Sequence, residues 1–171
     1  MRRRSAPLAD IRLLVLDVDG VLTDGRLYYG PRGEEGKSFH VRDGYGIKAV
    51  LAAGITVAVI SGRRSQAVAR RCRELGIRHV HQGIGDKAAS LARLAAQLGV
   101  PPRQIACVGD DRPDLPLLAQ AGLAVAVADA HPEALALAHR RTRFGGGAGA
   151  VREVCDWLLA ARLPRARAAA P

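Results

Sequence analysis

The 171-residue chain carries a formal net charge of +10, and 49 % of its residues are hydrophobic although only 4 % are aromatic. This composition suits one globular domain with a core of Ala, Leu, Val and Ile. No apolar stretch reaches the roughly 18 residues that a membrane span requires, no long apolar run marks a signal peptide, and no nucleic-acid-binding motif accompanies the positive charge. We therefore expect neither a membrane nor a nucleic acid as partner. Cys72, Cys107 and Cys155 form no CxxC pair, which disfavours a zinc site and favours reduced cysteines in a cytoplasmic protein.

Apolar runs alternate with helical patterns along the chain. Strands are predicted at 11–16, 55–60, 79–81, 105–108 and 123–127, and helices at 44–53, 65–75, 86–98, 114–121, 132–138 and 149–161. Segments 27–29 and 37–41 flank a Gly-Pro-Arg-Gly turn and predict a β-hairpin. Continuous apolar strands alternating with helices predict an α/β fold, with a Rossmann-like, mostly parallel sheet, helices on both faces and a hairpin flap. The 25–39 segment has room for the hairpin but not for a cap domain.

Three carboxylates, Asp17, Asp19 and Asp24, follow the first predicted strand within eight residues. Two like charges about 4 Å apart repel by roughly 4 kcal/mol at a protein surface. A cation, a shared proton or a reaction must offset that repulsion if the three side chains are close together. A solvated acidic turn is the plainer interpretation.

Polar side chains also follow the later strands. Ser61-Gly62-Arg63 follow the second strand, Asp86-Lys87 open a helix after the third, and Gly109-Asp110-Asp111 follow the fourth, with Asp114 three residues on. Carboxyl ends of parallel strands meet at one edge of a sheet. We therefore expect several carboxylates, a hydroxyl and an ammonium group to gather there, a mixture that suits Mg²⁺ and a phosphoryl group.

Each of these residues also has a purely structural interpretation. Ser61 could cap the helix that follows it, and Lys87 could be a solvated residue at a helix start. Asp110, Asp111 and Asp114 could cap the short helix after the fourth strand.

The pattern of these strand ends resembles the haloacid dehalogenase superfamily of phosphohydrolases. The motifs are Asp-x-Asp-x-x-x-Thr at 17–23, Ser-Gly at 61–62, the helix-opening Lys87 and Gly-Asp-Asp-x-x-Asp at 109–114. Further blocks at 40–46, 60–63, 128–132, 145–146 and 149–153 are similar to the 3-deoxy-D-manno-octulosonate 8-phosphate phosphatase family, over about 11–159. The resemblance implies a phosphatase domain at 11–161, between a basic N-terminal arm at 1–10 and a flexible C-terminal tail at 162–171.

The resemblance also implies catalytic roles. Asp17 would be the nucleophile that forms an aspartyl-phosphate, and Asp19 the general acid and later the general base. Mg²⁺ would be held by Asp17, Asp110 and the backbone carbonyl of Asp19, with Asp111 supporting the metal site. Ser61 and Lys87 would bind the phosphoryl oxygens.

The substrate implied by the resemblance is a sugar acid that carries both a carboxylate and a phosphate. The implied substrate contacts are Asp19, His40, Val41, Arg42, Asp43, Gly44, Lys48, Arg63, Arg71 and Lys87. Arg71 could instead be a surface charge of its helix. This chain has His40 where the family more usually has Asn, and Arg112 where an apolar residue is common.

Because the chain has no cap domain, its site would be open to water. The family resemblance implies a homotetramer in which the hairpins form a central barrel and neighbouring subunits supply the lid. The glycine block at 145–149 and the Arg-rich tail would then reach a neighbouring site.

The function expected from the resemblance is Mg²⁺-dependent hydrolysis of 3-deoxy-D-manno-octulosonate 8-phosphate in the cytoplasm, during lipopolysaccharide precursor synthesis. One alternative is a phosphatase for a nine-carbon sugar-acid 9-phosphate. A second is a non-catalytic oligomerisation or regulatory module of the same fold, which the intact acidic set disfavours. A third is a phosphoacceptor receiver, whose acceptor Asp normally follows a middle strand rather than the first.

Overall fold

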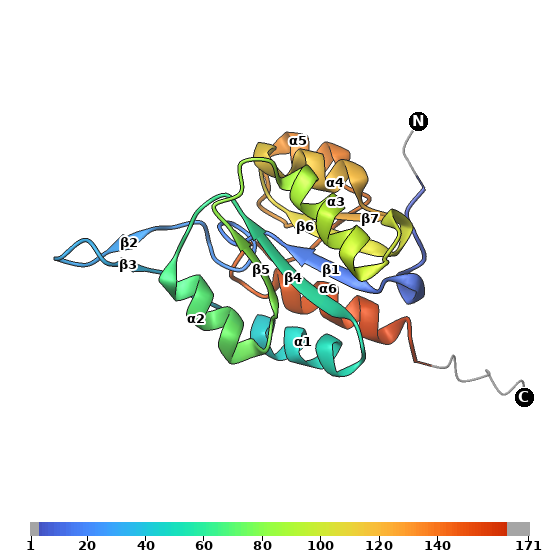
Figure 1. The fold of residues 1–171 in the computed structure, drawn as a ribbon, viewed down its shortest axis with the longest axis horizontal. Helices are drawn as coiled ribbons and strands as arrows, with labels where there is room; N and C mark the ends of the chain where they lie inside the picture. Colours follow the sequence, from blue (N-terminus) through green and yellow to red (C-terminus); the bar gives the residue numbers. More distant parts are fainter. Residues whose placement is uncertain (1–3, 164–171) are drawn as a thin grey trace, which may run out of the picture.

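The computed structural model describes residues 4–163, and its centre is a six-stranded sheet (Figure 1). In spatial order the strands are β5 (His79–Gln82), β4 (Thr56–Ser61), β1 (Leu13–Leu16), β6 (Ile105–Gly109), β7 (Leu123–Ala126) and β8 (Arg140–Arg141). Every neighbouring pair is parallel. The predicted α/β fold with a parallel sheet is therefore confirmed.

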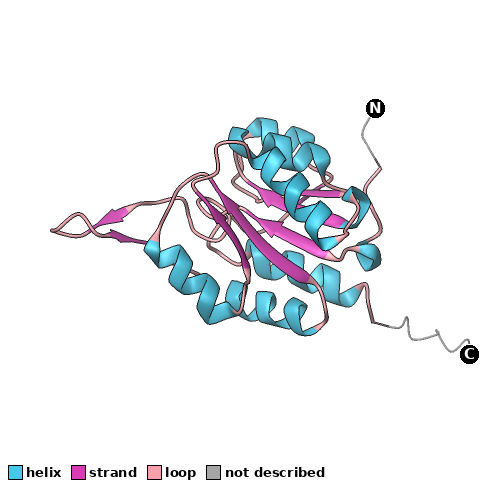
Figure 2. Cartoon of the chain, viewed as in Figure 1, coloured by secondary structure: helices cyan, strands magenta, loops and turns pink. Residues whose placement is uncertain are grey.

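Helices cover both faces of the sheet, as Figures 1 and 2 show. One face carries α1 (Val41–Ala52), α2 (Gln66–Leu75) and α6 (Ala150–Ala160), and the other carries α3 (Lys87–Leu98), α4 (Leu115–Gln120) and α5 (Pro132–Leu137). Strand β1 lies in the middle of the sheet, and all four of its residues are fully buried. Its carboxyl end, where Asp17 follows, is consequently enclosed by β4 and β6.

The hairpin consists of the antiparallel strands β2 (Tyr28–Tyr29) and β3 (Glu35–Gly36), and it projects from the body of the domain (Figure 2). The predicted second hairpin strand at 37–41 is wrong, because the chain leaves the hairpin after Gly36 and enters α1 at Val41. His40 explains the early helix start, since its Nδ1 accepts a hydrogen bond from the backbone N–H of Arg42 at 3.2 Å and caps the helix.

The other predicted strands and helices are confirmed with ends shifted by one or two residues, except that the helix predicted at 44–53 begins three residues earlier, at Val41. Strand β8 was missed, because its two arginines offer no apolar run or alternation. Three 3₁₀ helices, η1 (Leu8–Asp10), η2 (Pro102–Gln104) and η3 (Arg112–Asp114), were also missed. All three cysteines are free and buried, as expected.

The ends of the described chain pack against the domain. The backbone N–H of Ala6, in the predicted N-terminal arm, donates to the carbonyl of Gly122 at 2.8 Å. Arg162, the first residue of the predicted tail, donates to the carbonyls of Ala53 and Ile11 at 2.9 and 2.6 Å. Positions 1–3 of the arm and 164–171 of the tail lie outside the described residues. None of the helices within 4–163 has the length and hydrophobicity needed to cross a membrane.

Candidate active site

A cavity of about 220 Å³ lies beyond the carboxyl ends of β1, β4 and β6. Its lining contains both the predicted catalytic carboxylates and the predicted phosphate ligands. The lining residues are Asp17, Asp19, Ser61, Gly62, Arg63, Lys87, Asp110, Asp111, Pro113 and Asp114. The expected gathering of carboxylates, a hydroxyl and an ammonium group at one edge of the sheet is therefore confirmed.

Lys87 lies between two carboxylates at the start of α3. Its Nζ is 2.6 Å from Oδ1 of Asp17 and 2.7 Å from Oδ1 of Asp114, and only 6 % of its side chain is exposed. Burial alone would lower the pKa of Lys87, but the charges of Asp17 and Asp114 outweigh it and raise that pKa above its ordinary value. The interpretation of Lys87 as a solvated helix-start residue is wrong.

Asp17, Asp110 and Asp114 lie close together, and the one buried ammonium group beside them, that of Lys87, cannot neutralise all three carboxylates. Burial, followed by the charge of Asp114, raises the pKa of Asp17 to about 7 in spite of Lys87. Burial, followed by the charges of Asp17 and Asp114, raises the pKa of Asp110 to about 8. One carboxylate oxygen from each of Asp17, Asp110 and Asp114 lies within 4.8 Å of the other two. Among residues 4–163, this is the one cluster of three or more possible metal ligands. Three hard oxygen donors with excess charge fit a divalent cation such as Mg²⁺.

Two of these carboxylates have oxygens available for a cation. Both oxygens of Asp114 are engaged, because Oδ1 is at Lys87 and Oδ2 accepts from the backbone N–H of Asp110 at 3.0 Å. The carboxylate of Asp110 lies directly against Gly20, where a Cβ would be 2.1 Å from Oδ2. Asp110 thus reaches across to the turn that follows β1. Asp17 and Asp110 would hold the cation, while Asp114 positions Lys87 and the end of β6.

Asp111 and Arg112 have structural roles. Oδ1 of Asp111 accepts from the backbone N–H of Arg112 at 2.7 Å and caps η3, which supports the interpretation of this residue as a cap. The guanidinium of Arg112 donates twice to Oε1 of Glu133 in α5, at 2.9 and 2.6 Å. The unusual arginine therefore joins η3 to α5, a partnership that the sequence spacing did not reveal.

Ser61 is the last residue of β4 and is buried at the cavity. The cap position of α2 is occupied by Ser65, four residues later, so the interpretation of Ser61 as a helix cap is wrong. It lines the cavity together with Gly62 and Lys87, and its role as a phosphoryl ligand stays a prediction.

Asp19 belongs to a second group of charges at the base of the hairpin. The Nζ of Lys37 donates to Oδ1 of Asp19 and lies 3.3 Å from Oε1 of Glu35. Arg63 donates to Oε2 of Glu35 at 2.7 Å, and its Nε is 3.8 Å from Oδ2 of Asp19. Lys37 and Glu35 were missed in the sequence. The usable signal was that this Arg-rich chain has just three lysines, of which Lys37 and Lys87 both lie at the site.

The predicted substrate contacts on α1 and α2 do not line this cavity. Val41 and Arg42 are exposed, and His40 caps α1. Asp43 is buried, and its Oδ1 accepts from the backbone N–H of Arg152 in α6 at 2.7 Å. Burial raises the pKa of this carboxyl group. Asp43 therefore joins α1 to α6.

Arg71 and Lys48 lie elsewhere on this face of the protomer. The guanidinium of Arg71 packs against Gly44, where a Cβ would be 2.3 Å from Nη2, and lies 6.0 Å from the Phe39 ring centroid. Lys48 lines a separate cavity of about 680 Å³, near the amino ends of β4 and β5. Within one protomer, Lys48 is thus not brought to the acidic cavity.

The glycine block at 145–149 packs against its own chain. The backbone N–H of Gly147 donates to the carbonyl of Val21 at 3.0 Å, and that of Gly146 donates to Oδ1 of Asp129 at 2.9 Å. A Cβ at Gly146 would be 1.8 Å from the carbonyl oxygen of Gly20. The block supports the turn that carries Asp19, and its expected contact with a neighbouring subunit stays a prediction.

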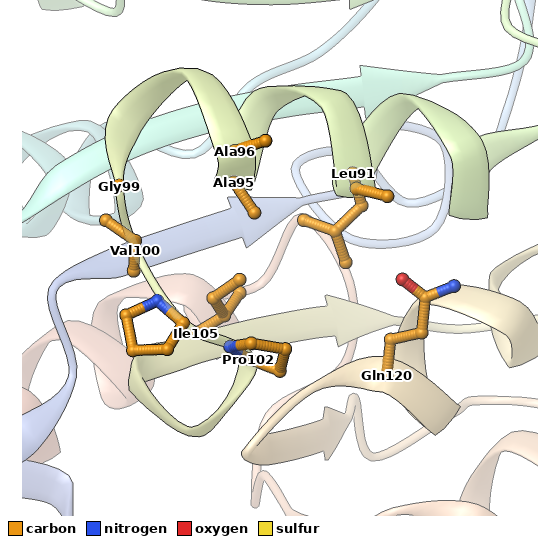
Figure 3. Close-up of a pocket in the computed structure, with 10 residues that line it drawn as sticks. Leu91, Ala95, Ala96, Gly99, Val100, Pro102, Ile105 and Gln120 are labelled. Carbon is orange, nitrogen blue, oxygen red and sulfur yellow. The ribbon is translucent and has the colours of Figure 1, made fainter.

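A third cavity, shown in Figure 3, is apolar. It measures about 450 Å³ and lies between the end of α3, the loop that leads to β6, and α4. Leu91, Val100 and Ile105 are among its lining residues, and Gln120 supplies the longest polar side chain. Because no titratable group lines it, this cavity offers no chemistry that competes with the acidic cavity.

Comparison with known proteins agrees with the fold. A model of the haloacid dehalogenase-like hydrolases matches residues 79–145. Together with the relatives described next, this match shows that the chain belongs to this class of hydrolases.

The similarity extends to a particular family. The 3-deoxy-D-manno-octulosonate 8-phosphate phosphatase of Yersinia pestis is 53 % identical over 154 residues, which cover 90 % of this chain and 82 % of that protein. A crystal structure of the Yersinia pestis phosphatase matches with a TM-score of 0.90 and 52 % identity, covering 91 % of this chain and 84 % of that one. The chain therefore belongs to the 3-deoxy-D-manno-octulosonate 8-phosphate phosphatase family of phosphoric monoester hydrolases.

A solved relative also shows ligands. The phosphatase of Moraxella catarrhalis, in complex with a magnesium ion, a phosphate ion and a KDO (3-deoxy-D-manno-octulosonate) molecule, matches with a TM-score of 0.89 and 42 % identity. The match covers 91 % of this chain and 90 % of that one.

Proposed function

We propose that this protein hydrolyses 3-deoxy-D-manno-octulosonate 8-phosphate to the free sugar acid and phosphate, with Mg²⁺ as cofactor. The observation that carries the proposal is the buried arrangement of Lys87 between Asp17 and Asp114, beside Asp110, in a chain 53 % identical to such a phosphatase. The alternatives, a nine-carbon substrate or a non-catalytic module, are outcomes of the test below.

The chemistry would divide between Asp17 and Asp19. A carboxylate oxygen of Asp17 attacks phosphorus, and the bond from phosphorus to the bridging oxygen breaks. Asp19 gives a proton to that oxygen as it leaves, and then takes a proton from the water that hydrolyses the aspartyl-phosphate. Ser61 and Lys87 would bind the non-bridging oxygens and stabilise the charge of the transition state.

Mg²⁺, held by Asp17, Asp110 and the backbone carbonyl of Asp19, would supply positive charge that screens the carboxylate nucleophile from the anionic ester. The raised pKa values of Asp17 and Asp110 support this role, because a bound cation would favour their ionised forms at neutral pH.

We propose a homotetramer as the functional assembly. Leu27, Tyr28 and Tyr29 expose apolar surface on the hairpin, and Val41 and Tyr45 expose it on α1. Exposed apolar surface of this kind is typical of an interface. An assembly through the hairpins would let His40, Val41, Arg42, Lys48 and Arg71 contact substrate in a neighbouring protomer, since one protomer does not bring them to its own cavity. The buried Asp43 and Gly44 would support this surface from behind.

The assembly can be tested by light scattering at several protein concentrations. A tetramer is expected for the wild type, and Tyr29→Glu should weaken it and raise the KM for the sugar-acid phosphate. A monomeric wild type with full activity would contradict this assembly.

We also propose a cytoplasmic location, which is supported by the three free cysteines.

The function is tested by measuring phosphate release from 3-deoxy-D-manno-octulosonate 8-phosphate and from a nine-carbon sugar-acid 9-phosphate. The wild type should prefer the eight-carbon ester and lose activity with EDTA. Asp17→Asn should lower kcat by roughly 10⁴-fold or more, as loss of a nucleophile does in other hydrolases. Arg70→Met, a change on the exposed face of α2, serves as the control.

Three results would overturn parts of the proposal. Preference for the nine-carbon ester would change the substrate. No release from either ester would support the non-catalytic module. Undiminished turnover by Asp17→Asn would exclude this residue as the nucleophile.

A further inference from the structure

Lys37 is the buried member of the charge cluster at the base of the hairpin. Its side chain is fully buried, although it follows β3 on the projecting part of the molecule. Burying an ammonium group is costly unless its partners are close and fixed. The two partners of Lys37 are Oδ1 of Asp19 and Oε1 of Glu35.

The cluster contacts each oxygen of Asp19 differently. Lys37 donates to Oδ1, whereas Oδ2 has only the longer contact of 3.8 Å with Nε of Arg63. Glu35 holds both cations, because one of its oxygens faces Lys37 and the other accepts from Arg63 at 2.7 Å. The carboxylate plane of Asp19 is therefore set from the hairpin, as well as by its own turn after β1.

We propose that Lys37 is a positioning residue that orients the carboxyl group of Asp19 for proton transfer. This inference rests on the proposed role of Asp19 as general acid and base. With Oδ1 occupied by the ammonium group, the proton that Asp19 delivers resides on Oδ2. It passes from Oδ2 to the bridging oxygen of the ester, which also takes the electron pair of the breaking P–O bond. Lys37 keeps its own proton throughout.

Esters whose leaving groups differ in basicity can show whether Lys37 positions the general acid or has only a structural role. An alkoxide is a poor leaving group that needs a proton, whereas 4-nitrophenolate leaves readily without one. The ratio kcat/KM reports the steps through cleavage of the ester bond, before the water step. A residue that positions the general acid should therefore affect kcat/KM for the alkyl ester far more than for the aryl ester.

The experiment compares kcat/KM for 3-deoxy-D-manno-octulosonate 8-phosphate and 4-nitrophenyl phosphate in wild type, Lys37→Met, Lys37→Arg and Asp19→Asn. In Lys37→Met we expect a loss of about 100-fold for the sugar-acid phosphate and about 3-fold or less for the aryl ester, because misplacing a general acid forfeits much of its contribution. Lys37→Arg should recover most of the loss. Arg70→Met, on exposed α2, should behave as wild type.

The double variant Asp19→Asn/Lys37→Met shows whether Lys37 acts through Asp19. In the Asp19→Asn background, Lys37→Met should cause no further loss. If Lys37→Met does not fold, Glu35→Gln loosens the same ammonium group and should show the same preference between the two esters with a smaller loss.

The outcomes distinguish this inference from the proposed function. Equal losses for the two esters, no loss, or a full additional loss in the Asp19→Asn background would each overturn the role of Lys37. Undiminished sugar-acid phosphate cleavage by Asp19→Asn would overturn the role of Asp19. No cleavage of the sugar-acid phosphate by the wild type would overturn the proposed substrate before any variant is compared.

Discussion

The two carboxylates proposed to share the catalytic work, Asp17 and Asp19, are held by different parts of the fold. Asp17 follows the central strand and pairs with Lys87, and both are buried by the sheet and by α3. We call Asp17, Lys87 and Asp114 the inner cluster. Asp19 lies only two residues after Asp17, but its partners are Lys37, at the base of the hairpin, and Arg63, in the loop after β4.

We call Asp19, Glu35, Lys37 and Arg63 the outer cluster. Asp19 and Glu35 keep 21 % and 17 % of their side chains exposed, and Arg63 keeps 46 %. The domain core therefore fixes the proposed nucleophile, whereas a projecting element that contributes little to the core holds the proposed acid and base. The inner cluster should govern stability as well as catalysis, and the outer cluster should govern catalysis more than stability.

The largest expected effect on stability is that of Lys87→Met. The change leaves Asp17 and Asp114 buried without their shared cation, and breaking a buried ion pair typically costs about 3–5 kcal/mol. Urea unfolding at pH 8, without divalent cations and at fixed protein concentration, measures the loss. A cost no larger than that of Arg70→Met would show that the inner cluster does not stabilise the fold.

A smaller loss is expected for Gly146→Ala, which perturbs the turn between the two clusters. The new Cβ would be 1.8 Å from the carbonyl oxygen of Gly20, and backbone cannot yield as a flexible side chain does. Forcing such an atom into packed structure costs about 1–3 kcal/mol, and the displaced turn should lower kcat. Gly85→Ala is the matched control, because no atom lies within 4 Å of its added Cβ. Equal stability and activity for the two variants would exclude the glycine block as a support of the turn.

The inner cluster is also the part of the site that could be predicted best from the sequence. Asp17, Ser61 and Asp110 each follow a predicted strand, and parallel topology alone brings the ends of such strands together. Lys87 was placed correctly because it opens the helix after the third strand. Its pairing with Asp114 depends on how α3 and η3 pack, which no local pattern contains.

Half of the outer cluster, Glu35 and Lys37, could not be predicted from the sequence for a related reason. Lys37 reaches Asp19 only because the hairpin ends at Gly36 and the chain turns back toward the domain, instead of continuing as the predicted strand. Strand β8 escaped prediction because its pairing with β7, rather than its own two arginines, makes it a strand. Local patterns therefore predicted the elements and the ends of central strands, but not the contacts made by irregular segments.

The increase in Tm caused by Mg²⁺ should depend on pH, because protons and the cation compete for Asp17 and Asp110. Between an ordinary pKa near 3.8 and the raised values of about 7 for Asp17 and about 8 for Asp110, the folded protein binds more protons than the unfolded chain. Without Mg²⁺, the contribution of these groups to stability therefore falls as pH rises through this range. Bound Mg²⁺ should offset that loss, so the increase in Tm on adding Mg²⁺ should be larger at pH 8 than at pH 6.

Asp110→Asn is the control for this linkage, because it removes one of the two proposed carboxylate ligands. Its Tm should respond weakly to Mg²⁺ at both pH values when followed by calorimetry. An equal response of the wild type at pH 6 and pH 8 would contradict competition between protons and the cation at this site.

The smallest effect on stability should come from Lys37→Met, the same substitution as Lys87→Met but made in the outer cluster. Asp19 and Glu35 can reach solvent once Lys37 is gone, and Arg63 remains beside both. Although the ammonium group of Lys37 is itself buried, its removal also removes the cost of burying that charge, and the partly exposed carboxylates regain water. The net change should lie near the value of about 0–1 kcal/mol that is typical of ion pairs with solvent access. We therefore expect urea unfolding to show a loss of about 1 kcal/mol, while cleavage of the alkyl ester falls steeply. A cost equal to that of Lys87→Met would mean that the hairpin base is part of the folding core, and that the acid and base are as rigidly supported as the nucleophile.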